Sequence, residues 1–140
     1  SYGPEMRGGT CNCSVVISDE SIGSPLVTAP DVLIAMNLPS LDKFEDSVVP
    51  GGTILLDSSL IDRKVTRQDV KVCYVDASRL AEENNMKGSA NIILVGKMFK
   101  ELGFCTEESL YKAVDKCVPP KKAALIEVNK NALKLGYSVE

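Results

Sequence analysis

The sequence contains no histidine and no tryptophan, and only 5% of its residues are aromatic. Without histidine, this chain cannot form a Ser–His or Cys–His nucleophilic pair of its own or bind a metal through an imidazole. Acid–base chemistry would have to use Asp, Glu, Lys, Tyr or Cys. The scarcity of aromatic rings argues against a stacking platform for single-stranded nucleic acid.

The chain also lacks a basic tract and a long apolar run. Its net charge of −3 gives no general attraction for nucleic acid. No apolar stretch approaches the roughly 20 residues that span a bilayer, and the N-terminus does not resemble a signal peptide. These two features predict a cytoplasmic protein. A length of 140 residues and a hydrophobic fraction of 44% predict one domain, residues 1–140, with a sizeable core.

Five cysteines are present, but no pair has CxxC spacing. The odd number and the spacing support neither a disulfide framework nor a zinc or iron–sulfur pattern. Cys73 and Cys117 are predicted to be core thiols. Cys11 and Cys13 would share one face of a strand, where packing is favoured over a redox pair.

The opening segment, residues 1–9, reads Ser-Tyr-Gly-Pro-Glu-Met-Arg-Gly-Gly and cannot build a core. It is predicted to be a shaped loop in which Gly3, Gly8 and Gly9 permit backbone angles or close approaches that a Cβ would forbid. Arg7 beside two glycines places a guanidinium next to backbone N–H groups, a combination suited to phosphate or carboxylate. The alternative is an ordinary turn in which Arg7 pairs with a local acid.

Apolar patterning predicts an α/β fold with a mostly parallel sheet, flanking helices and a helical C-terminal third. The predicted strands are residues 10–18, 31–36, 53–57 and 71–75. The first predicted helix follows the N-cap Ser40 and stops at Pro50. The later helices are residues 78–86, residues 88–102 closed by Gly103, a helix capped by Thr106 that ends before Pro119, and residues 121–135 ended by Gly136. The helix at 88–102 is apolar nearly all the way round, which predicts deep packing or contact with another subunit.

Ligands of parallel sheets bind beyond the carboxyl ends of the strands. Those ends are predicted at residues 37–40, 57–59 and 76–78, which are rich in Asn, Asp and Ser. They could form a pocket rim, with the amides at Ser40 available to an anion. The alternative is that polar residues and N-caps occur at every junction between a strand and a helix.

Several ordered motifs together resemble the gamma subunit of 2-oxoacid:ferredoxin oxidoreductases, particularly the 2-oxoglutarate and branched-chain 2-oxoacid types. The motifs cover nearly the whole chain: SYGPEMRGG at 1–9, TCNCS at 10–14, IGSP at 22–25, PDVLIAMN at 30–37, PSLDKFE at 39–45, PGG at 50–52, SSLI at 58–61, and Asn91 to Gly96 in the apolar helix. The resemblance implies a fold like domain III of pyruvate-ferredoxin oxidoreductase. It also implies an enzyme that oxidatively decarboxylates a 2-oxoacid, with 2-oxoglutarate favoured, using coenzyme A to give an acyl-CoA and CO2.

By the same resemblance, thiamine diphosphate, magnesium and the iron–sulfur clusters belong to partner subunits, namely alpha, beta and a ferredoxin-like delta, and ferredoxin accepts the electrons. The gamma subunit helps to enclose coenzyme A and is not itself the thiamine site. The residues carried over to this chain are Arg7, Gly8 and Gly9 for the coenzyme A phosphates, with Tyr2 and Glu5 shaping the loop. Asn37 and Ser58 are weaker candidates that rest on the strand-end argument.

The chain departs from the family pattern at its start. Family members usually begin with a strand and a Gly-x-Gly-Gly-Gln-Gly turn leading into a helix, and this sequence begins after that unit. We therefore expect an N-terminally truncated gamma domain that is unstable or self-associates when isolated. Two other functions stay open: a free-standing nucleotide- or CoA-binding module, and a purely structural subunit.

Overall fold

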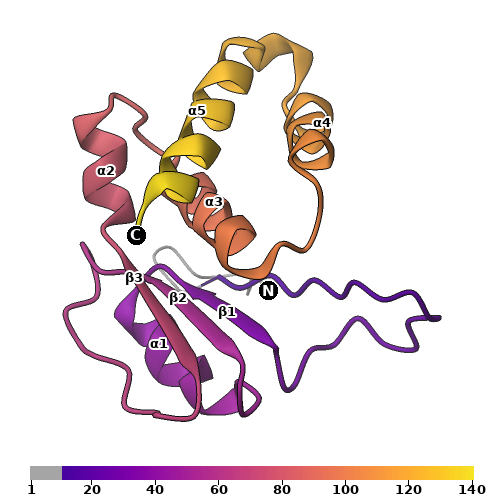
Figure 1. Cartoon of the computed structure of the whole chain (residues 1–140), viewed down its shortest axis with the longest axis vertical. Helices are drawn as coiled ribbons and strands as arrows, with labels where there is room; N and C mark the ends of the chain where they lie inside the picture. The colour runs from indigo at the N-terminus through magenta and orange to yellow at the C-terminus, as the bar shows by residue number, and fades with distance from the viewer. Residues whose placement is uncertain (1–10) are drawn as a thin grey trace, which may run out of the picture.

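The fold is built on a parallel sheet of three strands in the order β1-β2-β3, shown in a computed structural model that describes residues 11–140 (Figure 1). The strands are β1 (Val32–Ala35), β2 (Thr53–Asp57) and β3 (Lys71–Val75). Leu55 in the central strand lies opposite Ile34 on one side and Cys73 on the other. Three of the four predicted strands and their parallel pairing are thus confirmed.

Helices cover both faces of this sheet (Figure 1). One face carries α1 (Leu38–Phe44) and a short 3-10 helix, η1 (Glu45–Ser47), and the other carries α2 (Ala77–Glu83), α3 (Ala90–Leu102) and α5 (Ala124–Ser138). Because side chains alternate along a strand, Ile54 and Leu56 face the α1 core, while Leu55 faces the core formed with α2, α3 and α5. Every residue of β2 is buried, as its continuous apolar run predicts.

Helices α3 and α5 cross at two glycines. A Cβ added to Gly96 would overlap the Leu133 carbonyl, and one added to Gly136 would overlap the Ile93 carbonyl. The backbones can approach this closely only because both positions lack a side chain. The prediction that Gly136 ends the last helix is therefore wrong, since α5 continues through it to Ser138. Gly103 does end α3, in the left-handed conformation with φ of 56°.

Helix α4 (Glu107–Cys117) is the least buried helix, and a second 3-10 helix, η2 (Pro120–Lys122), links it to α5. Its predicted N-cap is confirmed, because the Thr106 side chain accepts a hydrogen bond from the Ser109 amide at 3.2 Å. No residue of α4 is buried, and Cys117 is exposed. The prediction that Cys117 is a core thiol is wrong, because α4 packs mainly against α5 and not on the sheet. Cys73 is buried as predicted, and burial raises the pKa of its thiol.

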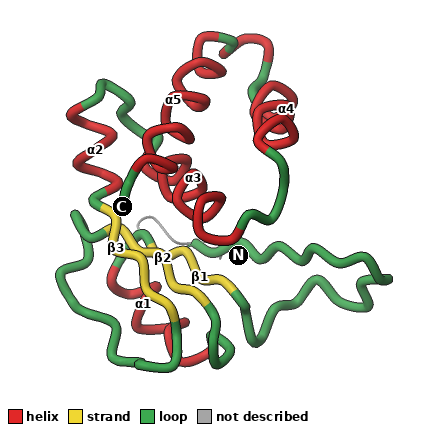
Figure 2. The backbone as a smooth tube through the Cα atoms, viewed as in Figure 1, coloured by secondary structure: helices red, strands yellow, loops and turns green. Residues whose placement is uncertain are grey.

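Residues 11–30 form an extended segment, here called the arm, that runs out from the body and returns to β1 (Figure 2). The part of the predicted strand 10–18 that the structure describes belongs to no strand, and its residues are all exposed. The prediction of a strand is wrong here because no described segment pairs with it. Cys11 and Cys13 are exposed, so the predicted packing of these two thiols is not found.

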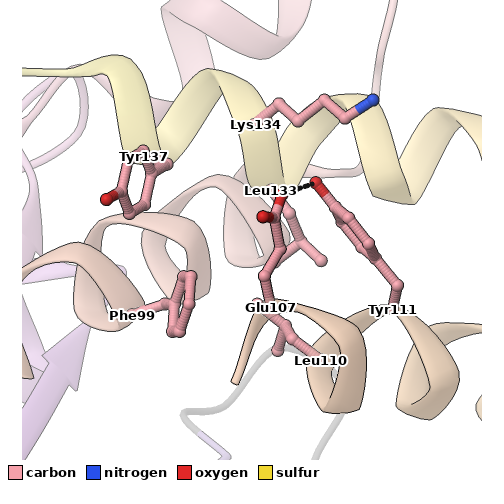
Figure 3. A pocket seen from close by; sticks show the side chains of 7 residues that line it. All are labelled: Phe99, Glu107, Leu110, Tyr111, Leu133, Lys134 and Tyr137. Carbon is pink, nitrogen blue, oxygen red and sulfur yellow. Dashed lines mark hydrogen bonds between the residues drawn. The ribbon is translucent and has the colours of Figure 1, made fainter. Parts of the chain in front are cut away.

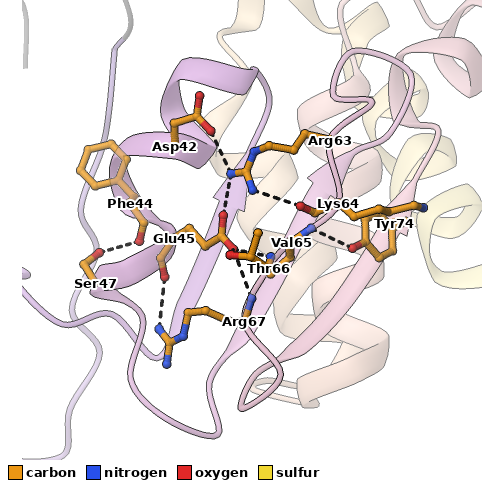
Figure 4. Close-up of polar contacts among 10 residues, drawn as sticks. All are labelled: Asp42, Phe44, Glu45, Ser47, Arg63, Lys64, Val65, Thr66, Arg67 and Tyr74. Atoms are coloured by element: carbon orange, nitrogen blue, oxygen red, sulfur yellow. Dashed lines mark hydrogen bonds and ion pairs between the residues drawn. The ribbon is translucent and has the colours of Figure 1, made fainter.

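The long loop between β2 and β3, residues 58–70, is fastened to η1 by the carboxylate of Glu45 (Figure 4). Glu45 is 4% exposed and accepts hydrogen bonds from Arg63 at 2.6 Å, from the Thr66 amide at 2.7 Å and from the Thr66 hydroxyl at 2.9 Å. Burial raises the pKa of Glu45, but the hydrogen bonds from Arg63 and Thr66 outweigh it and hold the pKa below its ordinary value. This carboxylate therefore fixes the loop that leads away from the strand ends.

Among residues 11–140, no helix combines the length and the hydrophobicity that a membrane crossing requires.

Candidate functional site

The carboxyl ends of β2 and β3 open into a shallow hollow of about 430 Å³. The loop after β2 and the start of α2 line it, through Ser58, Ser59, Leu60, Asp76, Ser78, Arg79 and Glu82. Two of the three predicted strand ends therefore meet at one edge, as the parallel topology requires. Asn37, at the end of β1, is not among the lining residues.

Asn37 is the N-cap of α1. Its backbone is extended, with φ of −153°, and its side-chain oxygen accepts a hydrogen bond from the Ser40 amide at 2.9 Å. Pro39 lies in the first turn, where its missing N–H is not needed. The prediction of Ser40 as the N-cap is wrong, because the cap is Asn37, three residues earlier, and the helix begins at Leu38. The Ser40 amide that was expected to be available to an anion is already bound to Asn37.

Asp57 joins the end of β2 to the start of α2, beside the hollow-lining residues Ser59 and Ser78. Its carboxylate is 0% exposed and accepts hydrogen bonds from the Ser59 amide at 3.1 Å, the Ser78 amide at 3.1 Å and the Ser78 hydroxyl at 2.6 Å. A buried carboxylate is tolerated only when such partners satisfy it. Asp57 therefore holds the two serine-bearing segments in place and is not exposed to a ligand.

The surface of the hollow is more acidic than basic. Ser58 donates to Asp76 at 2.5 Å, and Arg79 forms an ion pair with Asp76 and a longer one with Glu83 at 3.8 Å. The guanidinium of Arg79, the one basic group among the lining residues, is therefore shared between two carboxylates. Glu82 adds a further negative charge to the hollow. Such a surface offers hydroxyl oxygens that can accept hydrogen bonds, because Ser58 and Ser78 already donate their protons to Asp76 and Asp57, but it repels a phosphate that brings no counter-charge.

The sequence-predicted site residues fall into two groups. Tyr2, Glu5, Arg7, Gly8 and Gly9 lie outside the described residues. Asn37 and Ser58 are described, and both use their side chains in hydrogen bonds within the fold. Sequence reasoning missed Arg79 and Glu82; the signal that could have found Arg79 is its i,i+3 spacing from Asp76 at the start of α2.

A second hollow, of about 250 Å³, lies between α3, α4 and α5 (Figure 3). Its lining is largely aromatic and aliphatic, with Phe99, Tyr111 and Tyr137 among the residues. Tyr111 donates to Glu107 at 2.7 Å, and this hydrogen bond together with burial raises the Tyr111 pKa to about 12. Ligands of parallel sheets bind beyond the carboxyl ends of the strands, so we place the candidate site at the strand-end hollow.

Comparisons of the sequence and of the fold with known proteins identify the family of this chain. The family model described as pyruvate ferredoxin/flavodoxin oxidoreductase matches residues 1–139. The chain is 41% identical to ketoisovalerate oxidoreductase subunit VorA from Methanothermobacter thermautotrophicus, over 97% of this chain and 28% of that protein. It is 36% identical to 2-oxoglutarate synthase subunit KorC from Methanocaldococcus jannaschii, over 99% of this chain and 74% of that protein.

A solved structure gives the same result. The keto/oxoacid ferredoxin oxidoreductase gamma subunit from Geobacter sulfurreducens superposes with a TM-score of 0.68 at 28% identity, covering 76% of this chain and 62% of that one. The chain spans less than a third of the length of VorA and under two thirds of the Geobacter subunit. The match over residues 1–139 nevertheless includes all the elements described above. The chain belongs to the pyruvate ferredoxin/flavodoxin oxidoreductase family.

Proposed function

We propose that this chain is the gamma component of a 2-oxoacid:ferredoxin oxidoreductase and forms part of the wall around coenzyme A. The observation that carries the proposal is the family match over residues 1–139. The relatives act on different 2-oxoacids by name, ketoisovalerate for VorA and 2-oxoglutarate for KorC. The proposed substrate is therefore a 2-oxoacid as a class, with 2-oxoglutarate kept as the prediction from sequence.

The strand-end hollow fits one part of coenzyme A better than another. The hydroxyls of Ser58, Ser59 and Ser78 border it, and these groups suit the amides and hydroxyl of a pantetheine arm. The carboxylates of Asp76 and Glu82 do not suit a phosphate. We therefore assign the phosphates to the loop of Arg7, Gly8 and Gly9, with Tyr2 and Glu5 shaping it. Ser58 borders the hollow, and Asn37 lies at the end of the neighbouring strand β1.

The described residues have a positioning role in this proposal. Asp57 fixes the two serine segments, and Glu45 fixes the rest of the loop that begins with Ser58 and Ser59. A pocket wall that is rigid before the ligand arrives loses less conformational entropy on binding. We assign thiamine diphosphate, magnesium and the iron–sulfur clusters, which supply the decarboxylation and electron-transfer chemistry when bound, to partner alpha, beta and delta subunits.

The Arg7→Ala variant of the assembled enzyme tests the coenzyme A role. A charge-assisted hydrogen bond contributes about 1.5–3 kcal/mol, so its loss should raise the KM for coenzyme A about tenfold or more. The KM for the 2-oxoacid should not change. Lys121→Ala, which removes an exposed charge from η2, is the matched control and should leave both constants unchanged.

Normal assembly with an unchanged KM for coenzyme A would reject this role and favour the purely structural subunit. Co-purification from the native source addresses the other alternative. Recovery of the chain with thiamine-binding subunits and with 2-oxoacid-dependent dye reduction supports an oxidoreductase component. Recovery of the chain alone, with coenzyme A or a nucleotide bound, would favour a free-standing binding module.

A further inference from the structure

The three serine hydroxyls of the strand-end hollow differ in the hydrogen bonds that they can still make. A hydroxyl has one proton to donate and two lone pairs that accept. Ser58 donates its proton to Asp76 at 2.5 Å, and Ser78 donates its proton to Asp57 at 2.6 Å. An ionised carboxylate can only accept, so both protons are held in these directions. Toward a ligand, Ser58 and Ser78 therefore act as acceptors.

Ser59 has the opposite polarity. Its hydroxyl oxygen accepts a hydrogen bond from the backbone N–H of Arg79 at 3.2 Å, and no residue within 11–140 accepts its proton. Its own backbone N–H is bound to Asp57 at 3.1 Å, which fixes where the residue sits. Because its side chain is exposed in the hollow, Ser59 is the one of the three serines that can donate to a ligand.

Acceptors next to a donor match a secondary amide, whose N–H donates and whose C=O accepts. Leu60, which is 58% exposed, adds an apolar surface to the same lining. The pantetheine arm of coenzyme A carries two secondary amides joined by methylene groups, so it presents both kinds of surface. A phosphate needs donors around it, and two of the three hydroxyls have no proton left to give.

We propose that Asp76 sets the hydrogen-bond polarity of this hollow, so that Ser58 accepts the N–H of a pantetheine amide while Ser59 donates to an amide carbonyl. Asp76 follows β3 directly, and its side chain is 34% exposed. It is a positioning residue, because it acts on the ligand through the proton of Ser58. The inference rests on the proposed coenzyme A role and adds which group of the ligand the hollow recognises.

Arg79 makes the role of Asp76 testable. Ser58 binds Oδ1 of Asp76, and the Arg79 guanidinium, which has donors only, binds Oδ2. An asparagine at this position has a single carbonyl oxygen, which Arg79 would hold, and its NH2 group would then face Ser58. That NH2 group would donate to Ser58 and turn the Ser58 proton toward the hollow. Asp76→Asn should therefore reverse the polarity of Ser58 with little change in shape.

Calorimetric titration of the assembled enzyme with coenzyme A and with two ester analogues tests the proposal. Each analogue replaces one pantetheine amide N–H by an oxygen atom, which cannot donate. One of the two should bind the wild type about tenfold more weakly than coenzyme A, because two acceptor oxygens then face each other. In Asp76→Asn this preference should disappear or reverse. The matched control Glu83→Gln removes the other carboxylate near Arg79, at 3.8 Å and outside the lining, and should keep the wild-type preference.

Ser58→Ala keeps the test decisive if Asp76→Asn does not assemble, because it removes the acceptor and should abolish the preference. A preference that survives in either variant rejects the proposal. Equal binding of coenzyme A and both analogues to the wild type also rejects it, favours a main-chain amide of a partner subunit as the occupant of the hollow, and leaves the proposed function standing. Failure of coenzyme A to bind the wild type would reject the proposed function and this inference with it.

Discussion

β2 and residues 13–18 of the arm are both short and mostly apolar, but they have opposite environments. Both contain β-branched residues and neither contains a lysine or an arginine. Every residue of β2 is nevertheless buried, whereas residues 13–18 are all exposed. The difference lies in their neighbours, because β2 has a strand on each side and a layer of helices on each face. Strand propensity therefore describes how well a segment fits a sheet and does not by itself produce a strand.

The comparison between body and arm predicts that the same substitution will have very different effects in the two regions. The largest effect is expected at the crossing of α3 and α5. Gly136→Ala would push a methyl group into the Ile93 carbonyl and force the helices apart, which should lower the free energy of unfolding by about 3 kcal/mol. In the arm, the methyl group added by Gly23→Ala would have no atom within 4 Å. This substitution should therefore change the free energy of unfolding by less than about 0.5 kcal/mol. Urea unfolding of the two variants measures the difference, and equal values would contradict the backbone contact.

A smaller effect is expected from removing one buried charge. Glu45→Gln takes away the carboxylate that binds Arg63 and Thr66, and should cost about 1–3 kcal/mol of unfolding free energy. Glu20→Gln in the arm is the matched control, because Glu20 is exposed and should tolerate the change. Thermal unfolding of both variants provides the measurement. If Glu45→Gln were as stable as the control, the loop at 58–70 would not depend on this carboxylate.

The smallest effect is expected from an ion-pair cluster that depends on pH. Glu101 accepts from Lys71 at 2.5 Å and from the buried Lys97 at 2.7 Å, and these hydrogen bonds lower the Glu101 pKa from 4.5 to about 2. A carboxylate with a lowered folded-state pKa stabilises the fold above pH 4.5, and this contribution is lost as the pH falls toward 2. Glu101→Gln should therefore be less stable than the wild type by about 1 kcal/mol at pH 7.

Unfolding curves recorded between pH 7 and pH 2.5 should show the stabilities of Glu101→Gln and the wild type converging as Glu101 becomes protonated. A difference that stays constant over this range would show that the glutamine variant suffers from altered packing and not from the lost charge. The Glu20→Gln variant should follow the wild type at every pH.

Much of the body could be predicted from sequence because its signals are local. The apolar runs of β1, β2 and β3 needed no knowledge of distant residues, and the Gly103 and Thr106 termini follow from helix chemistry. The N-cap of α1 was harder to place, because both Asn37 and Ser40 can cap a helix and only the fold shows which one does. Gly136 misled the prediction because glycine ends many helices, and here it serves a contact with a helix some 40 residues away.

The candidate site was predictable in position but not in charge. Parallel topology alone brings the serine segments after β2 and β3 to one edge. Whether that edge attracts an anion depends on which carboxylates share Arg79, and this is decided by side-chain geometry at the start of α2. The exposure of the arm was equally hidden from the sequence, because local propensity does not tell which of the residues 11–140 pair with it.

The connection between β2 and β3 gives the Glu45 carboxylate a role in topology. Two parallel strands are usually joined by a crossover helix, whose apolar face packs on the sheet and guides the second strand into place. Residues 58–70 contain no helix, so the crossover has no such face. The Glu45 carboxylate accepts hydrogen bonds from Arg63, from Thr66 and from the Arg67 amide, which lie 18 to 22 residues away in the sequence. One buried charge, together with Ile61 and Val65 packed in the core beneath α1, thus holds this crossover in place, a task that a crossover helix performs in other parallel sheets.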